Sequence, residues 1–274
     1  MTIPALIDVD LVRRLERAEA MANAAFVEAR KSLAADVGAE WIEVAGAYAM
    51  FDGPESPITQ TFGLGLFEPF GKSEFRKVES FFCERGAPTA HEVSSFADRA
   101  SLALLNERGY SPIEASAVLL RDTSAAPSAA PAAAHADLEV RTIDGSEAEL
   151  WARTSAQGWG SESPELAAFV ETLGGILART AGAVCFVAEL ERVPVAAAAM
   201  YIVNGVALLA GASTIPGARR RGAQQALLGH RLALAAKRGI ELAMVVTQPG
   251  SASQRNAERQ GFRAAYTRTK WRRE

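Results

Sequence analysis

The sequence predicts an α/β (α+β) protein made of two domains with similar element order. Its 274 residues exceed one average domain, and each half is long enough to bury a core of its own. In both halves, amphipathic helical segments alternate with short apolar strand segments. An Ala- and Pro-rich stretch, residues 123–137, separates the halves. Such composition favours an extended tether, with an ordered helix or strand as the alternative, and leaves domains at 1–122 and 138–274.

The first half begins with an amphipathic helix. Apolar residues recur at helical spacing from Leu11 to Leu33, and Asp8 or Asp10 is suited to cap its start. The patterns that follow predict strands at 41–51, 58–67, 91–96 and 113–120, and helices at 73–85 and 98–109.

The second half repeats this order. Its patterns predict strands at 140–143, 183–190, 195–203, 206–214, 242–247 and 262–269, and helices at 145–157, 164–179, 222–238 and 253–260. Asn204-Gly205 indicates a tight hairpin. Both halves end with a short helix, a glycine and an aromatic residue, at Gly109-Tyr110 and Gly261-Phe262. This indicates a duplicated fold; the alternative is chance similarity of common α/β turn sequences.

The composition narrows the classes of partner. A net charge of −3 speaks against nucleic acid as an obligatory partner. Cys83 and Cys185 lack metal-ligand spacing and are expected to be buried thiols, without a metal. The N-terminus lacks the basic start of a secretion signal, and no apolar run is long enough to span a membrane. We therefore expect a cytoplasmic protein with no membrane partner.

One turn contains residue types that are suited to bind phosphate. A predicted apolar strand ends at Ile215, Pro216-Gly217 interrupts it, and three arginines precede Gly222 at the start of a helix. Helix N-termini expose unpaired backbone N–H groups and bind phosphate. A glycine there lets the backbone approach a pyrophosphate. Taken alone, a basic turn before a helix is also typical of a solvated surface.

In its context this turn resembles the pyrophosphate loop of the GCN5-related N-acetyltransferase (GNAT) superfamily, whose pattern is Arg/Gln-x-x-Gly-x-Gly/Ala. Residues 219–224 match its first four positions, with Gln224 in place of the last small residue. The resemblance implies two GNAT-like domains, each a mixed, mostly antiparallel central sheet flanked by helices. It implies acetyl-coenzyme A (acetyl-CoA) as co-substrate. The implied contacts in and before the turn are Ser213, Thr214, Ile215, Arg219, Arg220, Arg221, Gly222, Ala223 and Gln224.

A second motif of the family lies further along the chain. The segment Ser-x-Arg-x-x-Glu-Arg-x-Gly-Phe, residues 253–262, fits it. The resemblance implies that Ser251, Ser253 and Asn256 contact the cofactor; helix capping is the alternative for one of the serines. The fourth and fifth strands of the domain would splay apart to hold the cofactor.

The first half resembles the family only in outline. Residues 64–72 stand where its phosphate turn would be, but they contain no arginine, and Glu68 would repel a phosphate. We therefore expect a degenerate GNAT-like domain without a cofactor site, similar to the amino-terminal halves of tandem bacterial GNAT proteins.

The sequence assigns no catalytic residue. Ala257 stands where the family often has a tyrosine that acts as the general acid. Residues 206–214 contain no carboxylate that could act as the base. Glu189 is a candidate base and Tyr266 a candidate acid, although a solvated strand end and a core aromatic are the simpler interpretations. We expect an N-acetyltransferase acting on an amine of a small molecule or a protein. A non-catalytic acyl-CoA-binding module is the alternative, and homodimerisation stays open.

Overall fold

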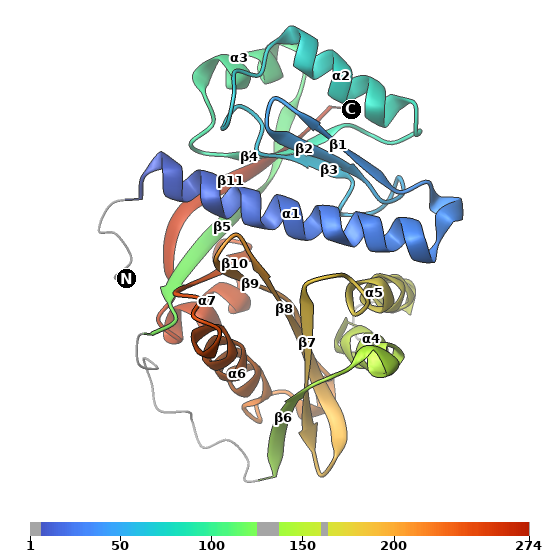
Figure 1. Ribbon diagram of the computed structural model, residues 1–274, viewed down its shortest axis with the longest axis vertical. Coiled ribbons are helices and arrows are strands. Elements are labelled where there is room, and N and C mark those ends of the chain that lie inside the picture. The colour runs from blue at the N-terminus through green and yellow to red at the C-terminus, as the bar shows by residue number, and fades with distance from the viewer. Residues whose placement is uncertain (1–6, 125–136, 160–163, 274) are drawn as a thin grey trace. The chain divides into compact units, whose positions relative to one another are not determined.

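The computed structural model describes residues 7–124, 137–159 and 164–273. They form two compact units (Figure 1). The N-terminal unit consists of residues 4–119, 246–254 and 264–274, and the C-terminal unit contains residues 120–245 and 255–263. The predicted division at 123–137 therefore differs from the observed one in the last segment, which belongs with the first half of the chain. Most of the predicted tether lies outside the described residues.

The N-terminal unit has a sheet with strand order β1-β2-β3-β4-β11-β5. Figure 1 shows α1 on one face of β1–β3, and α2 and α3 on the other. The helices are α1 (Val9–Leu33), α2 (Lys72–Cys83) and α3 (Arg99–Glu107). The strands are β1 (Glu40–Val44), β2 (Ala47–Phe51), β3 (Gln60–Phe62), β4 (Ala90–Ser94), β5 (Ser111–Asp122) and β11 (Arg263–Arg272). All pairings among β1, β2 and β3 and between β4 and β11 are antiparallel, whereas β3 and β4 are parallel.

The first helix forms as its spacing predicts. Asp8 caps it, since its carboxylate accepts a hydrogen bond from the Leu11 amide at 2.8 Å. The predicted single strand 41–51 was wrong, because Ala45 and Gly46 both adopt positive φ (48° and 75°) and turn the chain into a β1–β2 hairpin. The predicted strand 58–67 shortens to β3, because Gly63 and Gly65 also have positive φ and the chain turns there.

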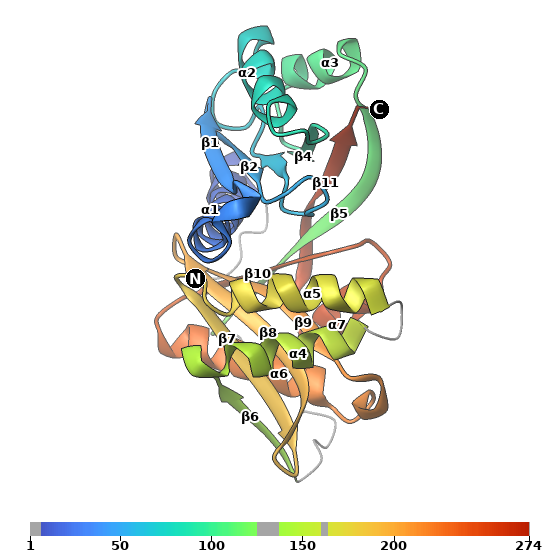
Figure 2. The ribbon, with the colours of Figure 1, turned by 90° about the vertical axis from the view of Figure 1, so that its right-hand side faces the viewer.

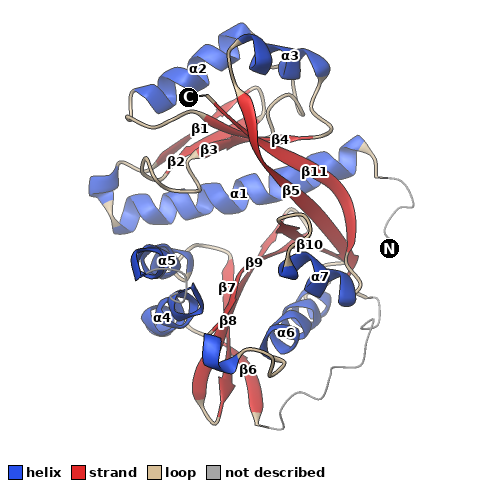
Figure 3. Cartoon of the chain, turned by 180° about the vertical axis from the view of Figure 1, so that it is seen from behind, coloured by secondary structure: helices blue, strands red, loops and turns tan. Residues whose placement is uncertain are grey.

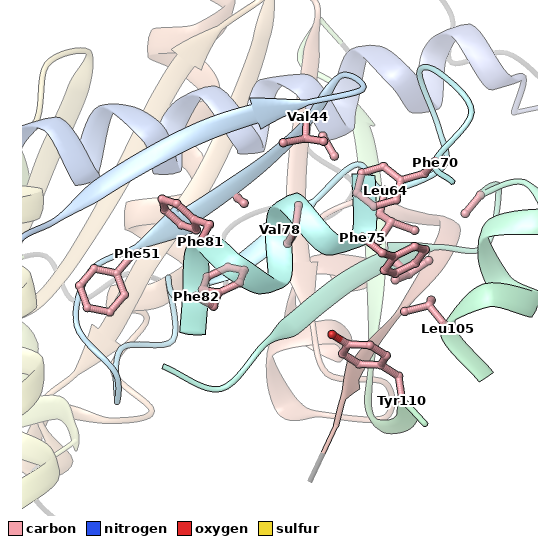
Figure 4. Close-up of a cluster of buried hydrophobic side chains, with 14 residues drawn as sticks. Val44, Phe51, Leu64, Phe70, Phe75, Val78, Phe81, Phe82, Leu105 and Tyr110 are labelled. Carbon is pink, nitrogen blue, oxygen red and sulfur yellow. The ribbon is translucent and has the colours of Figure 1, made fainter. Parts of the chain in front are cut away.

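The core on the α2 and α3 face is rich in aromatic residues (Figure 4). Phe70 and Phe75 pack edge to face with ring centroids 5.0 Å apart, and Phe81 and Phe82 do so at 5.2 Å. Such pairs add to the free energy gained from burial. The opposite face is covered by small residues of α1, which bring the helix close to Met50 and Phe62.

His91 lies within this aromatic core with no exposed surface, and neither ring nitrogen has a hydrogen-bond partner among the described residues. Burial lowers the pKa of His91 from 6.5 to about 3. The unfolded chain therefore binds the proton first as pH falls. We predict that the unfolding free energy of this unit falls by up to about 1.4 kcal/mol per pH unit below pH 6, because the imidazole must stay neutral in the fold.

Urea unfolding of the His91→Leu variant between about pH 7 and 4.5 checks this prediction. The variant should lose that part of the pH dependence. His230→Leu is the matched control, because it removes an exposed histidine and keeps His91, so the part of the slope due to His91 should remain. Equal slopes in wild type and His91→Leu would contradict the prediction.

The last strand of the chain completes the N-terminal unit. β11 pairs with β4 in antiparallel register, with Arg268 opposite Ser94 and Trp271 opposite His91. Figure 2 shows β11 between β4 and β5. Arg268 is 1% exposed, and its Nε donates to Glu16 Oε1 of α1 at 2.6 Å. Tyr266 donates to the same oxygen, so two side chains of β11 hold one oxygen of a buried carboxylate of α1.

The C-terminal unit has a sheet with the order β6-β7-β8-β9-β10, and β10 has the end of β5 as its other neighbour. The helices are α4 (Ala148–Trp159), α5 (Pro164–Leu177), α6 (Ala223–Lys237) and α7 (Ala252–Arg259). The strands are β6 (Leu138–Thr142), β7 (Ala183–Leu190), β8 (Val193–Val203), β9 (Val206–Thr214) and β10 (Leu242–Thr247). Figure 3 shows α4 and α5 on one face of β7–β9 and α6 on the other. The two tight hairpins turn at Glu191-Arg192 and Asn204-Gly205, all with positive φ.

Both units share one arrangement. In each, an antiparallel hairpin is followed by a strand, a crossover helix and a parallel strand: β3-α2-β4 in the N-terminal unit and β9-α6-β10 in the C-terminal unit. The duplicated order that the sequence indicates is therefore present in the fold. Of the cysteines, Cys185 is buried as expected, whereas Cys83 is exposed, because it ends α2 on the solvent side.

Candidate cofactor site

The site is built on β9, which is irregular in its second half. Ala197 pairs with Ser213 and Ala199 with Ala210, so Gly211 and Ala212 together face the single residue Ala198. This is a β-bulge, and Gly211 takes positive φ (58°) there. Gly211 and Ala212 are exposed although the strand is buried on both sides of them. The bulge therefore presents backbone groups to an open surface.

β9 and β10 separate beside the bulge. Their parallel pairing runs from Val206 with Leu242 to Leu209 with Val245, and ends there although both strands continue. This agrees with the expected splay of the fourth and fifth strands. Parallel strands that part leave backbone N–H and C=O groups without a strand partner, which suits an extended, amide-containing ligand.

The basic turn follows β9. Arg220 and Gly222 both have positive φ (65° and 85°), and α6 begins at Ala223. No side chain caps this helix at Gly222 in the described structure. The first intrahelical bond at this end is donated by the Ala226 amide to the Gly222 carbonyl. The amides of the preceding helical residues thus keep the free donors and positive dipole end that bind phosphate.

The side chains of the turn divide into two groups. Arg219 points back into the fold, with Nε donating to the Thr214 carbonyl at 3.3 Å and Nη2 to the Gly158 carbonyl at 2.9 Å. Gln224 donates to Thr214 Oγ1 at 3.0 Å. The glutamine that departs from the family pattern is therefore held toward β9 by a hydrogen bond. All three arginines are exposed, but Arg219 is held by two carbonyl groups, so Arg220 and Arg221 are better placed to meet a phosphate.

Helix α4 lies close against the end of β9. Ser213 Oγ donates to the Ser155 carbonyl at 3.0 Å. A Cβ placed on Gly158 would come within 2.6 Å of Ser213 Cβ, so only glycine allows this approach. Since Gly158 also accepts from Arg219, one helix turn fixes both the strand and the start of the basic turn.

We predict that Gly158→Ala destabilises the C-terminal unit by about 1–3 kcal/mol, because α4 must move away from Ser213. It should also weaken acetyl-CoA binding, since the Arg219 contact moves with it. Thermal unfolding and a binding titration check both effects. Gly229→Ala is the control: Gly229 lies in α6 with no atom within 4 Å of the added Cβ, so that variant should gain up to about 1 kcal/mol. Equal stability of Gly158→Ala and wild type would contradict the prediction.

The structure explains only part of the second predicted motif, residues 251–262. Ser251 Oγ accepts from the Gln254 amide at 3.1 Å and so caps α7, as the alternative interpretation held. Ser253 and Asn256 are exposed, and Asn256 accepts a hydrogen bond from Arg259. Residues 251 and 253 cluster with the N-terminal unit, whereas the turn at 219–224 and Asn256 belong to the C-terminal unit. Their contact with the cofactor stays a prediction.

The two candidate catalytic side chains are both engaged elsewhere. Glu189 is 8% exposed and accepts two hydrogen bonds from Arg141, at 3.1 Å and 2.8 Å. It is therefore a buried ion-pair partner and not the solvated strand end considered above. Tyr266 is buried in the N-terminal unit against Glu16, where burial raises its pKa well above 10. Neither arrangement supplies a free proton acceptor or donor.

The described part of the C-terminal unit contains hollows of about 320 and 270 Å³. One is polar and lies around Asp144 and Arg238, and the other is apolar and lies between β6 and α6. Neither contains a residue of the basic turn. In the parts of the chain that the structure describes, no cluster of three or more His, Cys, Asp or Glu side chains is arranged to hold a metal ion. No described helix is long and apolar enough to cross a membrane.

Residues 147–262 match the model of the Acetyltransferase (GNAT) family. This segment is a GNAT domain. The match begins just before α4 and ends after α7, so it contains the bulge, the basic turn and α6 of the C-terminal unit. No curated protein matches the chain.

Solved structures extend the likeness of fold beyond the GNAT domain. The chain is similar to a GCN5-related N-acetyltransferase from Kribbella flavida, with a TM-score of 0.68, 16% identity and 95% of each chain covered. It is also similar to a tandem GNAT protein from the clavulanic acid biosynthesis pathway (TM-score 0.60, 12% identity, 82% of this chain and 77% of the other). A third is a GCN5-related N-acetyltransferase from Sphaerobacter thermophilus (0.57, 14%, 78% and 71%). At such identities the likeness concerns the fold alone.

Proposed function

We propose that the chain is an N-acetyltransferase that transfers an acetyl group from acetyl-CoA to an amine of a small molecule or a protein. One observation supports this above all. The start of α6 has no side-chain cap and is preceded by arginines, and it follows β9, whose pairing with β10 ends before the strands do. Phosphates of the cofactor would bind the turn at Arg220, Arg221 and Gly222. The pantetheine arm would pair with the backbone of Ser213–Ile215 along the free side of β9.

The exposed bulge suits the reacting end of the cofactor. Acetyl-CoA supplies a thioester carbonyl, and its oxygen becomes more negative as an amine attacks. Backbone N–H groups aimed at such an oxygen stabilise it. Gly211 and Ala212 lie in a bulge, where strand pairing is disrupted. Since Glu189 is ion-paired with Arg141 and Tyr266 is buried against Glu16, the chain would act mainly by positioning both reactants, with water as the proton carrier.

The N-terminal unit offers a contrast that supports a single cofactor site. Its equivalent crossover helix, α2, begins at Gly71-Lys72, and the Glu74 carboxylate accepts from the Gly71 amide at 3.0 Å. A carboxylate thus already occupies this helix start, where it would repel a phosphate. We infer that the N-terminal unit has a GNAT-like fold without a cofactor site.

The positions where catalytic side chains were expected favour a second candidate function. Ala257 is buried where an acid would stand, and Glu189 is ion-paired. A module that binds acyl-CoA without turnover would need only the turn and the splayed strands. Both functions share the cofactor and differ in whether the thioester is consumed.

Two measurements test these proposals in order. A thermal-shift titration with acetyl-CoA and with coenzyme A should raise the melting temperature of the intact chain, because both carry the pyrophosphate. Thiol release is then followed over a panel of small amines and lysine peptides. Release with any amine supports the enzyme. Binding without release across the panel supports the acyl-CoA-binding module, and absence of binding overturns both.

A further inference from the structure

An arginine lies where α6 should be apolar. The buried stripe of this helix runs through Ala223, Leu227, Arg231 and Ala235, which are spaced four residues apart and are all less than 5% exposed. An apolar side chain at position 231 would continue the stripe and would save the desolvation of a guanidinium. Stability of the helix therefore does not explain this arginine.

The partners of Arg231 are carbonyl groups of the bulge region. Its Nη1 donates to the Ala199 carbonyl at 3.1 Å and lies 3.5 Å from the Ala210 carbonyl. Ala199 and Ala210 are the cross-strand pair immediately before the bulge. The Nε contact is within the helix, to Leu227 at 3.3 Å. Arg231 thus fastens α6 to β8 and β9 at the point where β9 becomes irregular.

The charge of Arg231 is not balanced by a carboxylate. Burial lowers its pKa to about 10, and no charged group contributes to that change. The guanidinium therefore stays positive at neutral pH within a region of low dielectric, where its field acts over several ångströms. Carbonyl dipoles alone compensate it in the described structure. An anion forming nearby would gain from this charge without any rearrangement of the protein.

We propose that Arg231 is a positioning residue that holds the bulge of β9 in shape and places a permanent positive charge beside the sulfur of the bound thioester. This rests on the proposed function. In that reaction the amine nitrogen forms a bond to the acetyl carbon, the carbon–sulfur bond breaks, and its electron pair leaves on sulfur as thiolate. The proton of the amine passes to water. The charge would stabilise the thiolate until it takes up a proton.

Other ionisable groups lie on α6 and on the elements around it. The strands that it packs against carry Glu139, Arg141, Cys185, Glu189 and Tyr201, and α4 on the other face carries Glu149 and Arg153. Arg141 pairs with Glu189 and Glu147, and Glu149 with Arg179. Burial raises the pKa of Cys185 to about 12 and that of Tyr201 above its ordinary value of 10. His230 and Lys237 lie on α6 itself and His230 is exposed.

The experiment needs no acceptor amine. The pKa of the thiol of bound coenzyme A is measured by the ultraviolet absorbance of the thiolate, over a pH range that includes the titration of free coenzyme A as the reference. Coenzyme A lacking the sulfur is the blank for the titration of phosphates and protein groups. Wild type should lower the thiol pKa. Arg231→Met, which keeps length and removes charge, should raise it by about one unit, a tenfold change in relative thiolate affinity. Arg231→Lys should stay close to wild type.

The outcomes separate this inference from the proposed function. If wild type binds coenzyme A without shifting its thiol pKa, the proposed role of Arg231 is wrong, whereas the proposed cofactor site is not contradicted. Equal thiol pKa values in wild type and Arg231→Met lead to the same conclusion. Failure of wild type to bind coenzyme A overturns the proposed function itself. If Arg231 has only a structural role, Arg231→Met should change the melting temperature without changing the thiol pKa. The measurement on wild type tests the proposal even if that variant folds poorly.

Discussion

Gly222→Glu is expected to weaken acetyl-CoA binding on the order of 100-fold or more, because it places a carboxylate where the pyrophosphate would bind. A unit charge about 4 Å from a phosphate costs roughly 4 kcal/mol at an effective dielectric of 20. Gly222 also holds φ at 85°, which adds roughly 1–2 kcal/mol of backbone strain for any residue with a Cβ. Isothermal titration calorimetry measures the loss of affinity for acetyl-CoA. Repeating it at a second salt concentration gives the electrostatic part of that loss.

Gly217→Glu is the matched control for this variant. It adds the same charge in the same connection between β9 and α6, at a glycine with no atom within 4 Å of the added Cβ. Gly217 lies five residues before Gly222, in the short 3-10 turn Pro216–Ala218, so binding should fall less than about tenfold, by long-range charge alone. Retained affinity in Gly222→Glu, with an unchanged melting temperature, would show that the turn is not the phosphate site and would remove the main support for the proposed function.

Deleting residues 264–274 is expected to unfold the N-terminal unit. The deletion removes β11, so β4 loses its antiparallel partner. It also leaves Glu16 buried without Arg268 and Tyr266. Loss of one partner of a buried ion pair alone costs about 3–5 kcal/mol, against a total stability of about 5–15 kcal/mol for a domain. By the same reasoning, residues 1–122 alone should not fold.

Hydrogen exchange of the truncated chain measures this effect. Amides of β2 and β4 should lose protection, and a synthetic peptide of residues 264–274 should restore part of it. Point variants refine the test. Arg268→Met should destabilise the unit by several kcal/mol. Glu16→Leu combined with it should recover much of the loss, because the fully buried carboxylate is removed and only Glu19, which is partly exposed, is left without Arg268. Arg272→Ala, at an exposed site on the same strand, should have little effect. Protected β4 amides in the truncated chain would refute the assignment.

Much of the secondary structure follows from local sequence patterns. β7, β9 and β10 have the predicted bounds, because runs of apolar residues bounded by Asn-Gly, Pro-Gly or a glycine after a helix mark strand ends. The hairpin of β1 and β2 was missed because Ala45 seldom takes positive φ, so the alternation of apolar residues looked like one strand. The turn at 219–224 was likewise visible from its residue types, since a phosphate site at a helix start needs only neighbours in sequence.

By itself, the sequence determined that the chain has two α/β halves of like order and a basic, glycine-containing helix start in the second half. Only the tertiary structure decided that β11 belongs to the N-terminal unit, that Gly211 and Ala212 form a bulge, and that Arg231 lies beneath it. It also decided that Arg219 and Glu189 are engaged by their own fold. The physical reason is the same for all of these: each depends on pairing between segments far apart in sequence, and no local propensity specifies which strand edge or carbonyl group a given side chain will meet.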